Sequence, residues 1–481
     1  MLFPTVNFAI FFIVVYWVSW RIRLVPVWWQ VFLIAASWFF YGYWNPRFVL
    51  LIAGSTVGNW AAAYTLNWAR ERYGLDSGMN KTLLGIFVAI NLGVLGWFKY
   101  YNFFTTSVLN TLGDIGIHIS QPVLEITLPI GISFFTFQAI SYIVDVSRGR
   151  FAPASFLDFA MYLSFFPHVI AGPIVRASEF IPQIAKRPSI TWVESGTAFR
   201  LIIAGLFKKV VISSYLSAKI VDPVFAAPHQ HSSLEVLFAI YGYAIQIYAD
   251  FSGYTDIAIG CALLLGFRFP QNFDSPYASL SLQDFWRRWH MTLSRWLRDY
   301  LYIPVGGNHG SRIFTMRNLM ITMVLGGLWH GAAWTFVIWG TIHGVGMCVE
   351  RYFHRVRPRV IGSAPQRASP AQIFVQWFIT FHVVCLAWVF FRAQSFTAAM
   401  DMLGRLFTGL GQASPLVTPT VLLAIGVSLA AQFIPSNAVQ GLWTAFTGLS
   451  PAMQGAALAV ALVTINAMGP RGVAPFIYFQ F

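Results

Sequence analysis

The sequence predicts an all-α polytopic integral membrane protein, because apolar segments of helical length recur along nearly the whole chain. Of its 481 residues, 57% are hydrophobic and only 10% are charged, whereas a soluble protein carries about 25% charged residues. The 45 Phe, 19 Trp and 19 Tyr residues suit lipid-facing surfaces and interfacial belts. At about 20 residues per span plus short loops, this length holds roughly 10 to 12 crossings. The composition argues against a large soluble protein.

Short polar stretches separate the apolar segments, which fall at 4–20, 26–44, 48–66, 83–100, 123–144, 157–173, 198–218, 234–266, 318–349, 372–391, 418–434 and 452–469. The segment 318–349 contains no Asp, Glu, Lys or Arg. At about 1.5 Å per residue it is longer than the hydrocarbon core of about 30 Å. We therefore expect this segment to be tilted, broken or re-entrant, and Gly326, Gly327 and Gly331 offer places to bend.

Basic loops predict the orientation of the chain. Arg21 and Arg23 follow the first apolar segment, and loop 67–81 carries further basic residues after the third. Loops rich in Lys and Arg are retained in the cytoplasm, so this spacing places the N-terminus outside. The loop 351–367 has five arginines and is the clearest cytoplasmic segment. The net charge of +14 comes from such short loops, which argues against a nucleic-acid partner.

The domain organisation follows from what the sequence lacks. It shows no repeat of fixed period and no Gly/Ser linker, so we expect a single membrane domain over 1–481. The three cysteines have no CxxC or CxxH spacing, and neither a disulfide framework nor a metal site is predicted. The first segment has no basic flank or cleavage site typical of a signal peptide. Within the domain we distinguish N-terminal spans 1–122, a catalytic core 123–349, a basic cytoplasmic loop 350–371 and C-terminal spans 372–481.

The densest cluster of charge and indole is QDFWRRWHMTLSRWLRDYLYIPVGGN, residues 283–308. Taken as one helix over 284–302, its large apolar side chains form a single stripe: Phe285, Trp286, Trp289, Leu293, Trp296, Leu297 and Tyr300. The opposite face carries Arg287, Arg288, Arg295 and Arg298 with Asp284, which is placed to pair with Arg288 one turn later. The helix either lies flat at the interface or dips into the protein to line a polar cavity.

The motif LWHGAAW places His330 in the middle of the uncharged segment, between Trp329 and Gly331. An ionisable residue at this depth faces a partner or a cavity rather than lipid. Burial favours the neutral imidazole, which accepts a proton from a hydroxyl as a general base. The competing interpretation is a core histidine that is hydrogen bonded between helices. For His343, nearer the end of the same segment, that structural interpretation is favoured.

Further polar residues interrupt apolar surroundings. Asp250 and Asp256 in QIYADFSGYTDIAIG need polar partners, and we expect the arginines of 287–298 to supply them. Ser133 and Ser252 are not in a GxSxG nucleophile elbow, so we interpret them as helix-packing residues.

The motifs WRRWHMTLSRWLRDYLYIPVGGN and LWHGAAWTFVIWG together resemble the membrane-bound O-acyltransferase (MBOAT) family, in its alginate O-acetyltransferase branch. QIYADFSGYTDIAIG, FPQNFDSPY, FFPHVIAGPIVR and the terminal PFIYFQF are also similar to that branch. The resemblance covers about Pro129 to Phe481. His309 and Gly310 depart from it after GGN, where Arg or Lys is common.

The resemblance implies a helical membrane body around a central tunnel, with His330 and His290 as the catalytic histidines. It implies transfer of an acetyl group from a cytoplasmic thioester, acetyl-CoA, to a hydroxyl on the other side of a bacterial inner membrane, with no bound cofactor. The implied partners are periplasmic proteins, an exopolysaccharide and the lipid bilayer itself. Residues expected to bind the donor or line the tunnel are Arg287, Arg288, Arg298, Asp284, Asp250, Trp329 and Asn308.

Several alternatives stay open at this point. The polymer is alginate, cellulose or another exopolysaccharide, and D-alanylation of teichoic acid uses the same fold. The immediate acceptor is the sugar or a serine of a partner protein. A transporter without chemistry is the rival class, although the lack of repeat symmetry counts against it. A structural subunit that recruits other proteins is a third possibility.

Overall fold

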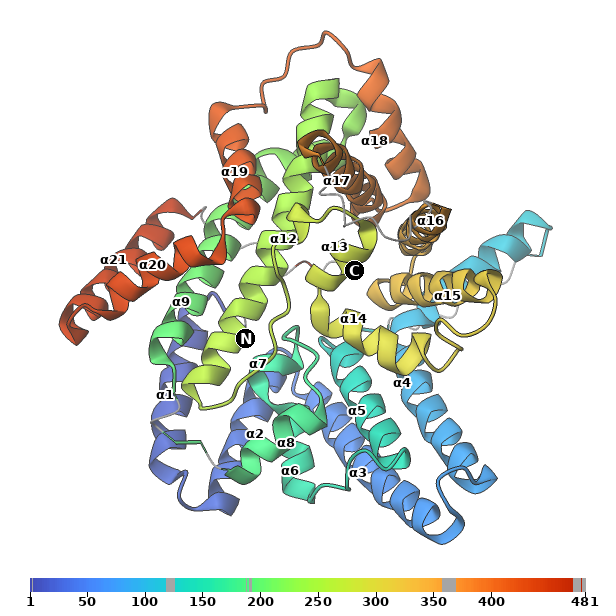
Figure 1. Ribbon diagram of the computed structural model, residues 1–481, viewed down its shortest axis with the longest axis vertical. Coiled ribbons are helices and arrows are strands. Elements are labelled where there is room, and N and C mark those ends of the chain that lie inside the picture. The colour runs from blue at the N-terminus through green and yellow to red at the C-terminus, as the bar shows by residue number, and fades with distance from the viewer. Residues whose placement is uncertain are drawn as a thin grey trace, which may run out of the picture. The chain divides into compact units, whose positions relative to one another are not determined.

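The computed structural model describes residues 1, 3–117, 126–186, 188–189, 193–356, 369–469 and 477. The all-α prediction is confirmed: the described part of the chain folds into helices and contains no strand (Figure 1). Four described helices are long and apolar enough to cross a membrane, namely Arg47–Tyr73, Gly78–Gly113, Ser195–Ala226 and Pro370–Arg392. Shorter apolar helices cover Val6–Ile22, Ile132–Ser147, Pro419–Phe433 and Ala452–Met468. The protein is therefore a multi-pass membrane protein, and the number of 10 to 12 crossings stays a prediction.

The chain divides into two compact units, Met1–Phe199 with Ala258–Pro270, and Arg200–Ile257 with Gln271–Phe481. The single membrane domain over 1–481 stays a prediction. The basic loop 350–371 lies largely outside the described residues, because 357–368 are among those not described.

The helices of the first unit are α1 (Val6–Ile22), α2 (Pro26–Gly42), α3 (Arg47–Tyr73), α4 (Gly78–Asp114), α5 (Ile132–Ser147), α6 (Phe156–Ser164), α7 (Phe166–Val169) and α8 (Ala177–Lys186). Asn59 of α3 and Asn91 of α4 exchange amide hydrogen bonds of 3.1 and 2.8 Å, a polar link of the kind that holds helices together in membranes. The apolar segment 157–173 forms no single span, since the chain leaves helical conformation at Phe165 and then forms only the four-residue α7, with Pro167 in its first turn.

The second unit begins at Arg200, within the helical run Ser195–Ala226, in which π-helical turns occupy Phe207–Ser213 and Ser217–Val221. It packs against α12 (Ser233–Leu264) so closely that a Cβ on Gly205 would lie 2.5 Å from the carbonyl oxygen of Gly253. The remaining helices are α13 (Leu282–Arg288), α14 (Met291–Leu297), α15 (Arg312–His330), α16 (Trp334–Val356), α17 (Pro370–Arg392), α18 (Phe396–Thr408), α19 (Pro419–Ala430), α20 (Ser436–Thr447) and α21 (Pro451–Met468).

The segment 318–349 is broken, as predicted. α15 ends at His330, Gly331 is extended, and α16 starts at Trp334 and packs back along α15. Glycines allow this contact, because a Cβ on Gly327 would lie 2.2 Å from the carbonyl oxygen of Phe336. Of the three glycines that offered a place to bend, only Gly331 lies at the break, whereas Gly326 and Gly327 lie within α15. Small residues at a helix crossing permit close backbone approach, which is their role here.

Candidate active site

The arginine-tryptophan segment is two short helices rather than one. α13 ends at Arg288 and α14 starts at Met291, so the predicted continuous helix over 284–302 was wrong. Trp289 is extended, and His290 has φ 42° and ψ 55°, in the left-handed region. A non-glycine residue in that region is uncommon and occurs mostly where surrounding contacts impose it. A π-helical turn, Arg298–Tyr302, follows α14.

The loop around Asn272 causes the break, because it forms hydrogen bonds with backbone groups that would pair with each other within a continuous helix. The amide of Asp274 donates to the carbonyl of Arg288 at 2.9 Å, and the amide of Met291 donates to the carbonyl of Asn272 at 2.9 Å. The amide and hydroxyl of Thr292 both donate to Asn272 Oδ1, at 3.1 and 2.9 Å. Asn272 therefore caps the first turn of α14, where backbone N–H groups otherwise lack acceptors.

Six of the seven residues of the predicted apolar stripe are buried despite the break, namely Phe285, Trp286, Trp289, Leu293, Trp296 and Leu297. Tyr300, the seventh, is half-buried. The two short helices therefore bury nearly the same set of apolar side chains that a single helix was predicted to bury.

His290 is fully buried in the second unit. Its Nδ1 lies 3.2 Å from Asn272 Oδ1. The ring of Phe251 meets it edge-on with centroids 4.7 Å apart, and the indole of Trp329 lies at 6.2 Å. The ring is thus fixed in orientation by one hydrogen bond and by aromatic contacts.

His330 is the last residue of α15 and is only 4% exposed. Its ring is surrounded by aromatic side chains, with centroid distances of 5.0 Å to Trp339, 5.3 Å to Phe391 and 5.0 Å to Trp329. Trp329 therefore contacts both candidate histidines. The structure brings together three residues that the sequence singled out, from two elements that lie about 40 positions apart in the chain.

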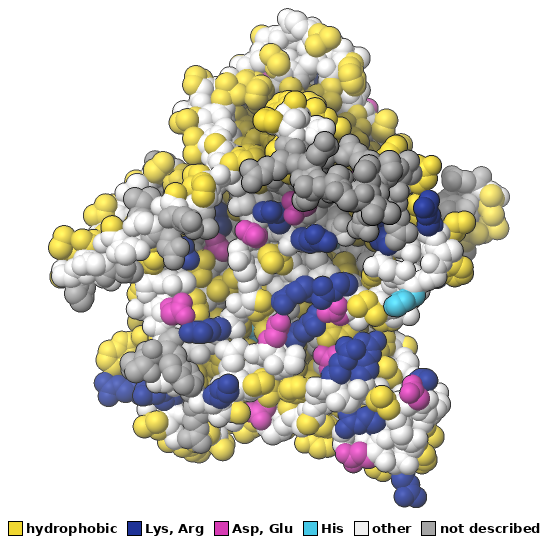
Figure 2. All heavy atoms as spheres, in the orientation of Figure 1, with side chains coloured by type: hydrophobic (Ala, Val, Ile, Leu, Met, Phe, Trp, Pro, Cys, Tyr) yellow, Lys and Arg dark blue, Asp and Glu magenta, His cyan; other side chains and the backbone are white. Residues whose placement is uncertain are grey.

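The charged face of the segment matches the sequence in part. Arg288 Nε lies 3.0 Å from Asp284 Oδ1, which confirms the predicted pair. Arg287 is exposed, and Arg298 is paired with the neighbouring Asp299 at 2.6 Å while remaining 59% exposed. Figure 2 shows Lys and Arg side chains interspersed with Asp and Glu on one face of the molecule.

The expected arginine partners of the intramembrane aspartates were wrong. Asp250 pairs with Lys209, and Asp256 pairs with Lys208. Asp250 and Lys209 are both 2% exposed, and the carboxylate also accepts from Ser213 Oγ at 3.2 Å and from the amide of Ile477 at 2.9 Å. Adjacent lysines in the π-helical turn meet aspartates of α12. Breaking a buried ion pair is costly. The contacts of Asp250 are therefore with residues of the protein itself, as expected for a structural role.

Two further predicted residues have structural partners. The Oδ1 of Asn308, which is exposed, accepts from the Tyr302 hydroxyl at 2.6 Å and braces the glycine turn. His343 is fully buried and its Nδ1 accepts from the Trp286 indole at 3.3 Å. This contact confirms the structural interpretation of His343 as a hydrogen-bonded core histidine.

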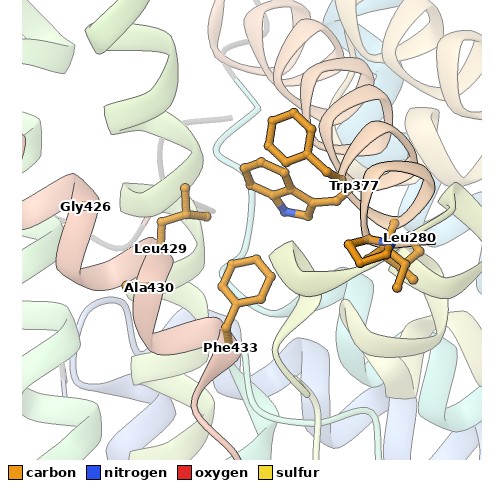
Figure 3. A pocket seen from close by; sticks show the side chains of 9 residues that line it. Leu280, Trp377, Gly426, Leu429, Ala430 and Phe433 are labelled. Atoms are coloured by element: carbon orange, nitrogen blue, oxygen red, sulfur yellow. The ribbon is translucent and has the colours of Figure 1, made fainter. Parts of the chain in front are cut away.

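An apolar groove of about 640 Å³ lies in the second unit, away from the residues that the sequence singled out. Figure 3 shows Trp377 of α17 facing Leu429 and Phe433 across it. The Trp377 indole donates to the carbonyl of Tyr277 at 2.9 Å, which holds the wall of the groove in place. The other lining residues are Leu280, Pro370, Ile373, Phe374, Gly426 and Ala430.

Asn272 is the site residue that sequence reasoning missed. It stands in FPQNFDSPY, which was recognised only as a polar island, and asparagine in a loop carries no signal for a particular partner. Lys208 and Lys209 were missed as well. Two adjacent lysines inside an apolar segment are a signal that could have pointed to intramembrane aspartates.

The two histidines that the motifs single out therefore lie buried in one helical unit, beside Trp329. The family model described as MBOAT, membrane-bound O-acyltransferase family, matches residues 80–391. The chain belongs to this family and is an O-acyltransferase.

Curated relatives agree with this assignment. The chain is 42% identical to a probable alginate O-acetylase AlgI of Pseudomonas aeruginosa, over 79% of this chain and 70% of that protein. It is 38% identical to a probable alginate O-acetylase AlgI of Azotobacter vinelandii, over 94% of both chains. It is 36% identical to a peptidoglycan O-acetyltransferase of Helicobacter pylori, over 79% of this chain and 73% of that protein.

Proposed function

We propose that this chain moves an acetyl group from cytoplasmic acetyl-CoA across the bacterial inner membrane for O-acetylation of an exopolysaccharide such as alginate, directly or through a periplasmic partner protein. The names of the similar proteins, two probable alginate O-acetylases and a peptidoglycan O-acetyltransferase, support acetyl transfer to a glycan. The convergence of His290 and His330 on Trp329 is the observation that carries the proposal. The N-terminus is periplasmic in this proposal.

In the proposed reaction, His330 removes the proton of the acceptor hydroxyl as its oxygen attacks the carbonyl carbon of the acetyl thioester. The new C–O bond gives a tetrahedral oxyanion. When it collapses, the C–S bond breaks. The leaving sulfur takes the proton from His330 and departs as the free thiol. His290 orients the acceptor or stabilises the oxyanion. The exposed Arg287 and Arg298 lie on the polar face of the segment and attract the phosphates of the donor.

Replacement of His330 tests the proposal. His330→Ala should lower acetyl transfer by about 10²- to 10⁴-fold, the range typical of general acid–base catalysis, while the protein remains in the membrane. The measurement is transfer of labelled acetyl from acetyl-CoA to alginate oligosaccharides by protein purified in detergent. His309→Ala, at an exposed position in the glycine turn, is the control and should retain activity. Full activity of a stably expressed His330→Ala protein contradicts the catalytic role.

The same assay separates the rival functions. A transporter would leave the label on acetyl-CoA, and a D-alanyltransferase would fail with acetyl-CoA as the donor. Because one relative is a peptidoglycan O-acetyltransferase, a peptidoglycan fragment is the second acceptor to test. Label found on a copurified periplasmic protein instead of a glycan would identify that protein as the immediate acceptor.

A further inference from the structure

The side chain of Asn272 determines the chemical state of His290. Asn272 is 1% exposed, and its Oδ1 lies 3.2 Å from His290 Nδ1. The same oxygen accepts from the amide of Thr292 at 3.1 Å and from its hydroxyl at 2.9 Å. Three polar groups therefore meet one atom of the Asn272 amide.

That atom is the oxygen rather than the nitrogen of the amide. A backbone N–H only donates, and the amide of Thr292 points at it, so an NH₂ group in this place would set two donors against each other. Because the amide oxygen only accepts, the Nδ1 of His290 must carry a hydrogen in order to bind it. The neutral His290 ring consequently has its lone pair on Nε2, since a neutral imidazole carries one N–H.

A lone pair on Nε2 limits what neutral His290 does in the reaction. The carbonyl oxygen of an acetyl thioester is an acceptor, so Nε2 gives it no hydrogen bond in this tautomer. The acceptor molecule brings O–H groups to the reacting centre, and Nε2 can accept a hydrogen bond from one of them. Of the two roles proposed for His290, the tautomer favours orientation of the acceptor over stabilisation of the oxyanion.

We propose that Asn272 is a positioning residue, which holds His290 as a hydrogen-bond acceptor for a hydroxyl of the acceptor molecule. This inference rests on the proposed function, in which His330 takes the one hydrogen of the attacking hydroxyl. The hydroxyl held by His290 is then a different one. A sugar ring carries such neighbouring hydroxyls, so a glycan acceptor could bind both histidines at once.

Two variants separate this role from folding. Asn272→Asp keeps an oxygen that accepts from His290 and from Thr292, so it should retain the tautomer and the cap of α14. Asn272→Leu keeps the branching at Cγ but has no acceptor. It should shift His290 away from the Nδ1–H form and raise the KM for alginate oligosaccharides by about tenfold, the cost of one hydrogen bond. The KM for acetyl-CoA should stay near its wild-type value.

Nitrogen NMR of protein labelled with ¹⁵N-histidine reads the tautomer without any need for activity. The chain has 10 histidines, and the signal of His290 is assigned as the one lost in His290→Gln. Asn318→Leu is the matched control. Asn318 is also 1% exposed, but its amide donates to the carbonyl of Gly307 at 3.0 Å, so its loss should leave the tautomer of His290 unchanged.

An Nε2–H tautomer for His290 in active wild-type protein would overturn the inference and leave the proposed function standing. Unchanged tautomer and acceptor KM in Asn272→Leu would overturn it as well. If the Nδ1–H tautomer is present but neither a glycan nor a partner protein receives acetyl from acetyl-CoA, the proposed function and the role of His290 in binding the acceptor both fail, and only the hydrogen bond to Asn272 remains.

Discussion

The two candidate histidines lie at two helix interruptions of different kinds. Between α15 and α16 the chain turns through Gly331, with φ −157° and ψ 151°, a conformation open to any residue. Between α13 and α14 the turn is made by His290 itself, with φ 42°. The first interruption allows two helices to pack closely, whereas the second is imposed by hydrogen bonds that Met291 and Thr292 donate to Asn272. Interruptions that look alike in a helix diagram thus have separate physical causes.

The comparison predicts that the α15–α16 interruption depends on small residues. Gly327→Ala should have the largest effect on stability, since its Cβ would lie 2.2 Å from a backbone carbonyl that cannot move alone. We expect a loss of about 1–3 kcal/mol or more, measured by thermal unfolding in detergent. Gly326→Ala is the control, because its Cβ would meet only the Leu297 side chain, at 3.3 Å. Equal stability of the two variants would contradict this account.

The α13–α14 interruption should instead depend on tolerance of the left-handed region. His290→Asn and His290→Val both remove the imidazole, but asparagine visits this region and a β-branched residue does not. We expect the valine variant to unfold at lower denaturant concentration, with a difference of about 1–2 kcal/mol. If the two variants are equally stable, the backbone at position 290 does not hold this conformation in the protein.

The charged face of the same segment should contribute least. Asp284→Ala breaks the pair with Arg288, whose members are 31% and 35% exposed. Pairs of this kind contribute about 0–1 kcal/mol, and less at high salt. Thermal unfolding at low and high salt should differ only slightly between this variant and the wild type. A large loss would show that the charges, rather than Asn272, hold α13 against α14.

Sequence patterns determined much of this protein, because some physical causes are local. The abundance of apolar segments predicts helices in a membrane, and an uncharged run longer than the bilayer predicts a break in 318–349. The spacing of Asp284 and Arg288 predicts their pairing, and a histidine between Trp329 and Gly331 in the middle of an uncharged run marks His330 as a candidate. These inferences need only helical periodicity and the cost of placing polar groups in lipid.

Tertiary structure decided the features that depend on residues distant in the chain. Periodicity favoured one helix over 284–302, but Asn272, from another loop, supplies the acceptors that end it at His290. The aspartates of α12 meet Lys208 and Lys209 rather than arginines, because folding places a π-helical turn beside α12. Helical spacing specifies which residues share a face. It does not specify which distant group will satisfy a buried donor or charge, since that depends on the packing of the whole unit.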